Sequence, residues 1–126
     1  MTLLLAVAIG GAIGSLARHL LGAEIGHWLG PGFPYGTLAV NVIGGLVMGL
    51  LVELMALKWS AGPEIRAFLT VGLLGGFTTF SAFSLDVVLL TERGDWAAAG
   101  AYVAGSVLLS IAALIAGLRL MRAVLA

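Results

Sequence analysis

The stretch GLLGGFTTFSAFSLD, residues 72–86, decides how this chain folds. It lies within a long apolar run, yet Gly75 and Gly76 stand side by side and are followed by a cluster of threonine, serine and phenylalanine residues. Adjacent glycines weaken a helix, and hydroxyl side chains can bond backbone groups that a broken helix sets free. The pattern predicts a helix that is broken between Gly75 and Ser81. A kinked but continuous helix, whose hydroxyls bond back to their own carbonyls, is the alternative.

The rest of the chain places this stretch in a membrane. Of the 126 residues, 61% are hydrophobic and 10% are charged, whereas soluble domains carry about 25% charged residues. The mean hydropathy is +1.16. The apolar runs predict an all-α integral membrane protein, with four transmembrane helices in a single domain, residues 1–126. We expect the spans at about 2–22, 36–57, 64–91 and 97–119.

The break lies in the third of these spans. Unwound backbone at membrane depth must be buried in protein or line a cavity, because unsatisfied amides in hydrocarbon are costly. Carbonyl oxygens exposed in this way can hold a cation. The N-terminus lacks the positively charged start of a signal peptide, so we interpret it as a retained first span.

Charges are few and balanced. Six Lys and Arg residues offset six Asp and Glu residues, which gives no reason to expect a nucleic-acid partner, and the absence of cysteine excludes thiolate chemistry. With four spans, both termini share a side with the second connection. Four of the basic residues fall on that side and two on the other: Lys58, Arg66, Arg119 and Arg122 against Arg18 and Arg93. So small a bias specifies orientation weakly, with the termini inside if one orientation dominates; insertion both ways and chance in a short chain both explain it.

Small residues recur at helical spacing in the first two spans. Gly10 and Gly14 form one such pair, and Gly45 and Gly49 form another. Missing side-chain bulk lets helices approach closely in lipid. Packing within one chain and a dimer face are equally good interpretations.

Polar side chains on the other helices predict a lined path. Asn41 lies on the small-residue face of the second span, where it either offers a donor to a ligand or holds two helices together. Tyr102, Ser106 and Ser110 follow at i, i+4 and i+8, so their hydroxyls form one stripe, which can equally serve close packing. Arg18 lies late in the first span and is a functional candidate unless it snorkels to the interface.

An uncharged lining that is rich in hydrogen-bond donors suits a small anion. Amide and hydroxyl groups replace the water donors of a hydrated anion without trapping it as a fixed charge does. Phenylalanine edges carry the positive part of the ring quadrupole, so Phe80 and Phe83 can face an anion as well. The sequence contains no nucleophile, base and orienter constellation and no phosphate-binding loop, so we expect no enzyme.

Three motifs together resemble the Fluc, or CrcB, family of fluoride channels along essentially the whole chain. They are GGAIGSLARH at 10–19, GTLAVNVIGG at 36–45 and GGFTTFSAFSLD at 75–86. The resemblance implies an antiparallel, dual-topology homodimer in the cell membrane, the inner membrane of a prokaryote, with two fluoride pores and a central structural sodium ion. It implies a protective role too, in which fluoride that accumulated from entering HF leaves passively.

The resemblance also implies residue roles. Pore positions match Asn41, Thr79, Phe80, Ser81 and Phe83, and more softly the stripe of Tyr102, Ser106 and Ser110. The sodium-facing carbonyls belong to Gly75 and Thr78, and Arg18 falls at an arginine that contributes to an anion-attracting vestibule. Ala82 stands where many relatives have threonine, which removes one hydroxyl beside the pore.

A small multidrug-type proton-coupled antiporter is the alternative function, because such proteins also pair four-helix chains antiparallel. It needs a titrating carboxylate at the bilayer midplane. The first span has no acidic residue, and Asp86 lies too near the end of its span for that role. A non-transporting scaffold is a third possibility, although it explains the glycines and not the polar residues.

Overall fold

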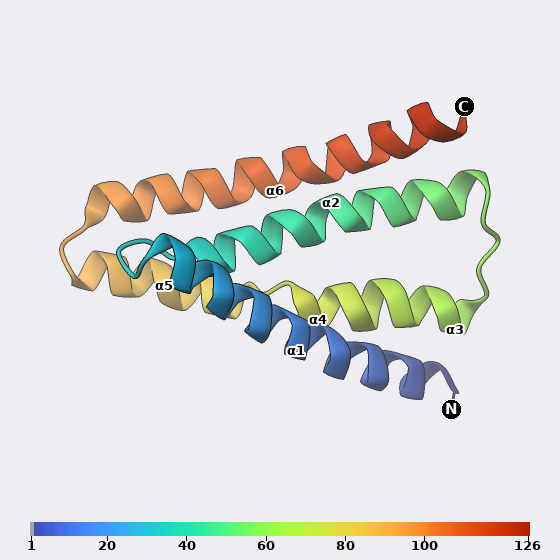
Figure 1. Ribbon diagram of the computed structural model, residues 1–126, viewed down its shortest axis with the longest axis horizontal. Helices are drawn as coiled ribbons and strands as arrows, with labels where there is room; N and C mark the ends of the chain where they lie inside the picture. Colours follow the sequence, from blue (N-terminus) through green and yellow to red (C-terminus); the bar gives the residue numbers. More distant parts are fainter. Residues whose placement is uncertain (1) are drawn as a thin grey trace.

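The computed structural model describes residues 2–126, and all regular secondary structure in this range is helical (Figure 1). Two long helices come first, α1 (Thr2–Leu29) and α2 (Tyr35–Leu57), and a last long helix, α6 (Trp96–Leu125), ends the chain. The third long segment is divided into α3 (Pro63–Arg66), η1 (Ala67–Leu74), α4 (Gly75–Phe77) and α5 (Ser81–Glu92). Four segments are long and apolar enough to cross a membrane, which confirms the expected number of apolar helices and the bend in the third.

Two helices are longer than the apolar runs suggest. The first was expected to end near residue 22, yet α1 continues to Leu29 and stops where Gly30 turns the backbone to a φ of +91° ahead of Pro31. The last continues past Arg119 to Leu125. Both additional segments contain polar residues. Such residues end an apolar run in the sequence but do not end a helix, so both helices extend beyond the apolar spans.

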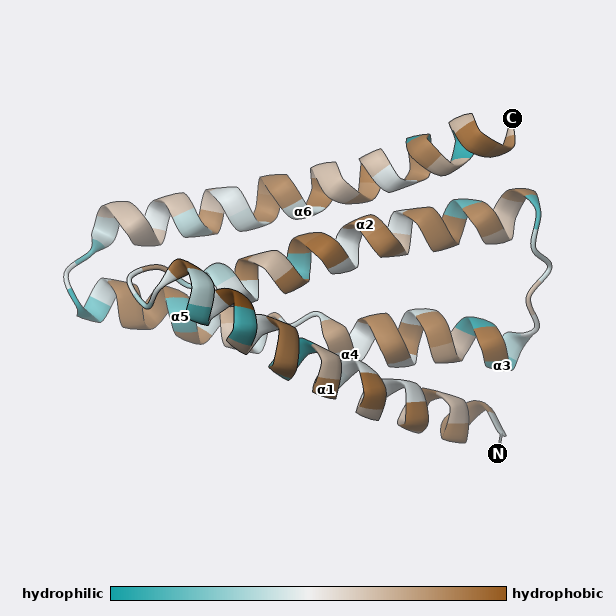
Figure 2. Ribbon diagram, viewed as in Figure 1, coloured by the Kyte–Doolittle hydropathy of each residue, from teal (hydrophilic) through white to brown (hydrophobic). Residues whose placement is uncertain are grey.

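The helices form two closely packed pairs. In Figure 1, α2 and α6 run side by side, while α1 crosses the third segment. Both termini and the α2–α3 connection lie at the same end of the molecule. Figure 2 shows mainly hydrophobic ribbons, with hydrophilic residues at the connections and also within α1, α2 and α5. Most of the apolar surface of these helices is not buried against other described residues, as expected for helices that face lipid.

Glycines make the close contacts within each pair. A β-carbon on Gly45 would lie 2.8 Å from the carbonyl oxygen of Ser110, and one on Gly76 would lie 2.6 Å from that of Gly11. Gly49 and Gly14 leave even less room, against the backbone of Leu114 and Leu73. These glycines therefore serve packing within one chain, which is one of the two interpretations that the sequence left open.

The break lies within the predicted range of Gly75 to Ser81, in its second half. Gly75 and Gly76 are still helical, and the backbone becomes extended at Thr78, with φ −93° and ψ 160°. Regular helix resumes at Ser81. The glycines contribute close approach of this segment to α1, whereas the break itself begins at a threonine. Before it, η1 is a π-helix of 8 residues, a rare geometry that often marks functional segments.

Candidate functional site

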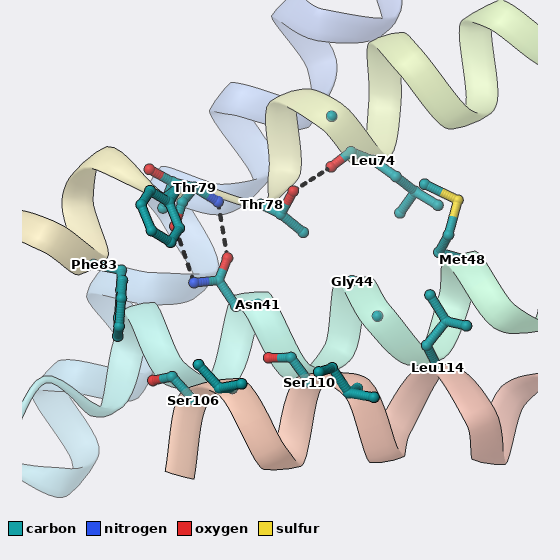
Figure 3. A pocket seen from close by; sticks show the side chains of 15 residues that line it. Asn41, Gly44, Met48, Leu74, Thr78, Thr79, Phe83, Ser106, Ser110 and Leu114 are labelled. Carbon is teal, nitrogen blue, oxygen red and sulfur yellow. Dashed lines mark hydrogen bonds between the residues drawn. The ribbon is translucent and has the colours of Figure 1, made fainter. Parts of the chain in front are cut away.

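Asn41 and Thr79 are paired at the break. The side-chain amide of Asn41 donates to the carbonyl oxygen of Thr79 at 3.0 Å, and its oxygen accepts from the Thr79 N–H at 2.8 Å (Figure 3). In a continuous helix this N–H would bond the carbonyl of Gly75, four residues earlier. Asn41 therefore takes the donor away from Gly75, and the helix cannot continue through Thr79.

A second helical hydrogen bond is replaced by a bond to a side chain about one turn later. The Ala82 N–H, which a continuous helix would direct to the carbonyl of Thr78, donates instead to the Thr79 hydroxyl at 3.1 Å. On the other side, the Arg18 Nε–H donates at 3.0 Å to the carbonyl of Gly76. Three side chains thus replace hydrogen bonds of a continuous helix: Arg18 from α1, Asn41 from α2 and Thr79 from the break itself.

These replacements leave the carbonyls of Gly75 and Thr78 without a donor, and among the described residues the carbonyl of Phe77 has none either. Within residues 2–126, no hydrogen bond reaches the carbonyls of Gly75 and Thr78. They are the two oxygens to which the resemblance assigns a sodium ion, and unwound backbone carbonyls are suitable sodium ligands. The described residues contain no cluster of three or more His, Asp or Glu side chains able to hold a metal. The donor chemistry therefore fits a cation held by backbone.

A groove of about 500 Å³ lies along α2, the break and α6 (Figure 3). It brings together eight of the residues that the sequence singled out: Asn41, Gly75, Thr78, Thr79, Phe80, Phe83, Ser106 and Ser110. Toward its far end the lining is apolar, with Met48 and Leu114. The groove thus has a polar half beside the break and an apolar half beyond it.

Ser106 is the most informative residue of the groove. Its side chain is 7% exposed, and its hydroxyl has no hydrogen-bond partner among the described residues. A buried polar group is normally paired, and each exception needs an explanation. Ser106 lines the same space as Asn41, whose amide nitrogen carries a second hydrogen beyond the one bonded to Thr79. Two donors are therefore available to a ligand in the polar half.

Phe80 and Phe83 lie in very different surroundings. Their rings are 5.4 Å apart at a tilt of 46°, and both line the groove. Phe80 is 77% exposed on the surface of the chain, whereas Phe83 is 9% exposed and packs against Tyr102 with ring centroids 5.1 Å apart. One ring is thus fixed by this chain and the other is presented outward.

Three predicted site residues lie outside the groove. Tyr102 is fully buried, and its hydroxyl donates to Asp86 at 2.9 Å, so the hydroxyl stripe is divided, with only Ser106 and Ser110 on the groove. Ser81 lies next to the groove, with its hydroxyl 3.4 Å from that of Thr79. Arg18 lines a second pocket.

That second pocket, of about 340 Å³, lies between α1 and α2. Besides Arg18 its lining includes His19, Thr37 and Ala82, of which only Ala82 was placed beside the pore by the family resemblance. Thr79 borders both this pocket and the groove. The break therefore lies between two hollows, one lined by Arg18 and one whose lining is uncharged and mainly apolar, with a few hydrogen-bond donors beside the break.

Sequence reasoning also missed two contacts around Tyr102. Phe33, from the α1–α2 connection, meets the Tyr102 ring edge-on at 5.4 Å, and Asp86 accepts its hydroxyl. In the sequence, Asp86 stood out only as an acidic residue near the end of its span. Its contact with Tyr102 depends on the way α5 and α6 pack, for which the sequence holds no signal.

Comparison with known proteins identifies the family. The family model described as CrcB-like protein, Camphor Resistance (CrcB), matches residues 5–118. A protein of Rhodospirillum centenum named fluoride-specific ion channel FluC is 57% identical over 126 residues, which are 100% of each chain. Proteins of the same name from Nitrobacter winogradskyi (54% identical, 98% of each chain) and Phenylobacterium zucineum (55% identical, 100% of each chain) are also similar.

These similarities confirm the resemblance that the three motifs indicated. The relatives carry the name of a channel and not of an enzyme. Together with four apolar helices, they make this chain a multi-pass membrane protein. Because the family model covers most of the chain and relatives are more than half identical to it from end to end, this protein belongs to the CrcB family.

Proposed function

We propose that this protein is a fluoride-selective ion channel, through which fluoride leaves the cell passively. The observation that carries the proposal is the Ser106 hydroxyl, buried on the groove without a partner and beside the Asn41 amide. Its relatives named fluoride-specific ion channels, similar over the whole length, support the same function. A channel of this kind protects a cell in which fluoride has accumulated.

The lining suits the chemistry of fluoride. This anion holds its hydration water strongly, so a path through the membrane must offer replacement donors. Asn41, Ser106 and Ser110 offer uncharged donors on the groove, which bind an anion without holding it as tightly as a fixed charge. Phe83 adds a ring whose edge carries partial positive charge. Conduction requires this moderate affinity.

An antiparallel homodimer with two pores is part of the proposal. Gly75 and Phe80 are exposed on the surface of a single chain, at the break. Backbone that has left the helix cannot face lipid, since its polar groups need partners or water. A second copy would cover this surface and enclose the groove. The weak charge bias of the chain is compatible with two opposite orientations.

A structural sodium ion at the centre is the third part of the proposal. The carbonyls of Gly75 and Thr78 would hold it, because their helical donors are diverted to Asn41 and Thr79. A cation bound there would neutralise the partial charges of the free carbonyls and hold the break in one conformation. Its role is structural, with no part in carrying fluoride.

The antiporter alternative receives no support from the groove. No carboxylate is among the residues that line it, and Asp86 accepts a hydrogen bond from Tyr102, which lies outside the groove. A proton-coupled mechanism needs a carboxylate that substrate and proton can both reach.

Ion efflux from liposomes tests the proposal. Purified protein is reconstituted into vesicles that are loaded with potassium fluoride or potassium chloride, and efflux is started with valinomycin. We expect fluoride to leave rapidly, chloride to stay, and the fluoride rate to be independent of an imposed proton gradient. Proton-coupled export of a cationic drug without fluoride efflux would instead identify the antiporter.

A further inference from the structure

Arg18 has a second role that the vestibule does not explain. It donates through Nε to the carbonyl of Gly76 at 3.0 Å, across 58 residues of sequence, in a part-buried position. In a continuous helix the donor to this carbonyl would be the Phe80 N–H, which the extended backbone at Thr78 has moved away. The arginine therefore supplies the hydrogen bond that the break removed.

The location of that bond matters because of its neighbours. Gly76 lies between Gly75 and Thr78, whose carbonyls are free and line the groove. The Phe77 carbonyl has no donor among the described residues either, so without the arginine all four carbonyls of residues 75–78 would lack a hydrogen bond. The bond from Arg18 holds the Gly76 carbonyl toward α1 and so restrains the backbone immediately before the break.

The packing of α1 makes this cap possible. Gly76 has its Cα against the backbone of Gly11, so closely that a β-carbon would lie 2.6 Å from the Gly11 carbonyl oxygen. Gly14 is equally close to the backbone of Leu73. At this separation Arg18, one helical turn beyond Gly14, reaches the carbonyl through Nε, and the same residue lines the second pocket.

We infer that Arg18 is a positioning residue for the helix break, acting through the Nε–H bond to the Gly76 carbonyl rather than through its charge alone. The inference goes beyond the proposed function and rests on it only in naming the ion path that the break serves. Arg18, from α1, and Asn41, from α2, hold the break from two sides. The first holds a carbonyl, and the second holds both backbone groups of Thr79.

Three substitutions separate the hydrogen bond from the charge. Arg18→Gln places an amide nitrogen directly after Cδ, where arginine has Nε, so it keeps the donor and removes the charge. Arg18→Lys keeps the charge and places a methylene group at that point. Arg18→Met removes both. Arg93 offers a matched control, since it also donates to a backbone carbonyl, that of Gly32 at 2.8 Å, at a distant turn.

Hydrogen–deuterium exchange of the purified protein provides the main readout. The measured quantity is the exchange rate of peptides covering 74–84 relative to peptides covering 108–118 in α6, so that a general loss of stability, which raises both, does not count. We expect Arg18→Gln to stay close to the wild-type ratio. Arg18→Lys and Arg18→Met should raise it about tenfold or more, as for a lost hydrogen bond to a charged group. Arg93→Gln and Arg93→Lys should leave it unchanged.

Any other order overturns the inference. If Arg18→Lys keeps the wild-type ratio, or if Arg18→Gln exchanges as fast as Arg18→Met, the residue acts through its charge. This measurement needs neither fluoride nor sodium. A second measurement compares the melting temperature in sodium with that in N-methylglucamine: Arg18→Gln should keep the wild-type shift and Arg18→Lys should lose most of it. If the wild type shows no shift, the sodium proposal fails, while the exchange experiment still decides the role of Arg18.

Discussion

Asn41 pairs with both backbone groups of Thr79 at the break: its side-chain amide donates to the Thr79 carbonyl, and its side-chain oxygen accepts from the Thr79 N–H. The Asn41 side chain, from a neighbouring helix, takes the place of the Gly75 carbonyl as the acceptor for the Thr79 N–H. The pairing also divides the work of Asn41, because one amide hydrogen is committed to structure while the second is available on the groove. The two interpretations of Asn41 that the sequence left open, holding helices together and offering a donor, are thus compatible.

Replacing Asn41 by leucine should destabilise the protein and stop conduction. Leucine has a similar volume and no polar atoms, so the N–H and C=O of Thr79 lose their partners in a water-poor region. We expect the free energy of unfolding to fall by about 2 kcal/mol and fluoride efflux to be lost. Unfolding in detergent and liposome efflux measure the two effects. Wild-type stability in Asn41→Leu would contradict the pairing.

Ser106 should behave in the opposite way. Ser106→Ala removes a buried hydroxyl that has no partner, so the free energy of unfolding should stay the same or rise by up to about 1 kcal/mol. Fluoride efflux should fall about tenfold, because a donor to the anion is lost. Thr91→Ala serves as the control, since that hydroxyl is exposed and bonds the carbonyl of Val88. Equal efflux in Ser106→Ala and Thr91→Ala would remove Ser106 from the path.

Replacing Phe80 and replacing Phe83 should affect the stability of the protein differently but affect fluoride efflux in the same way. Phe80→Ile alters an exposed ring, and the stability of a single chain should hardly change. Phe83→Ile loses the contact with Tyr102, which should cost about 1 kcal/mol. Both should abolish fluoride efflux without preventing assembly. Size-exclusion chromatography checks assembly, and unchanged efflux in either variant would place that ring outside the pore.

Glycine packing gives a prediction that is independent of function. Gly49→Ala should destabilise the protein by about 1–3 kcal/mol, because its β-carbon would collide with the backbone of Leu114. Gly26→Ala, in α1, has no atom within 4 Å of the new methyl group and should be neutral or stabilise by about 0.5–1 kcal/mol. Thermal unfolding of both variants tests the contrast. Equal melting temperatures would show that α2 and α6 are not this close.

Sodium should stabilise the protein if the carbonyls of Gly75 and Thr78 hold it. Replacing sodium by N-methylglucamine should lower the melting temperature, and the loss should depend on sodium concentration as mass action requires. Potassium at the same ionic strength is the control for general salt effects. Normal folding and normal fluoride efflux in the complete absence of sodium would refute the structural role.

Much of the fold follows from sequence because the membrane restricts the choices. A chain this apolar must form helices long enough to span, and glycine pairs at helical spacing must lie at close contacts. The existence of a break could be predicted from Gly75, Gly76 and the hydroxyl residues after them. The sequence limited the break to residues 75–81, and the structure places its start at Thr78, next to the residue whose N–H Asn41 accepts.

The way the helices pack decides which residues of different helices come into contact. Hydropathy and spacing report what one helix presents to its surroundings, whereas the rotation and crossing of helices decide which donor meets which acceptor. The Tyr102 hydroxyl was predicted to continue the stripe of Ser106 and Ser110, but in the structure it donates to Asp86. Arg18, in turn, donates to the carbonyl of Gly76.

The sequence by itself determined that this protein lies in a membrane, that its third helix fails near the middle, and which motifs it shares with the CrcB family. Only the tertiary structure decided that Thr78 begins the break, that Asn41 and Arg18 hold it, and that Ser106 is left with a free hydroxyl. The reason is physical: burial of apolar surface is a property of each segment, while hydrogen bonds between segments exist only once backbones have approached to within reach.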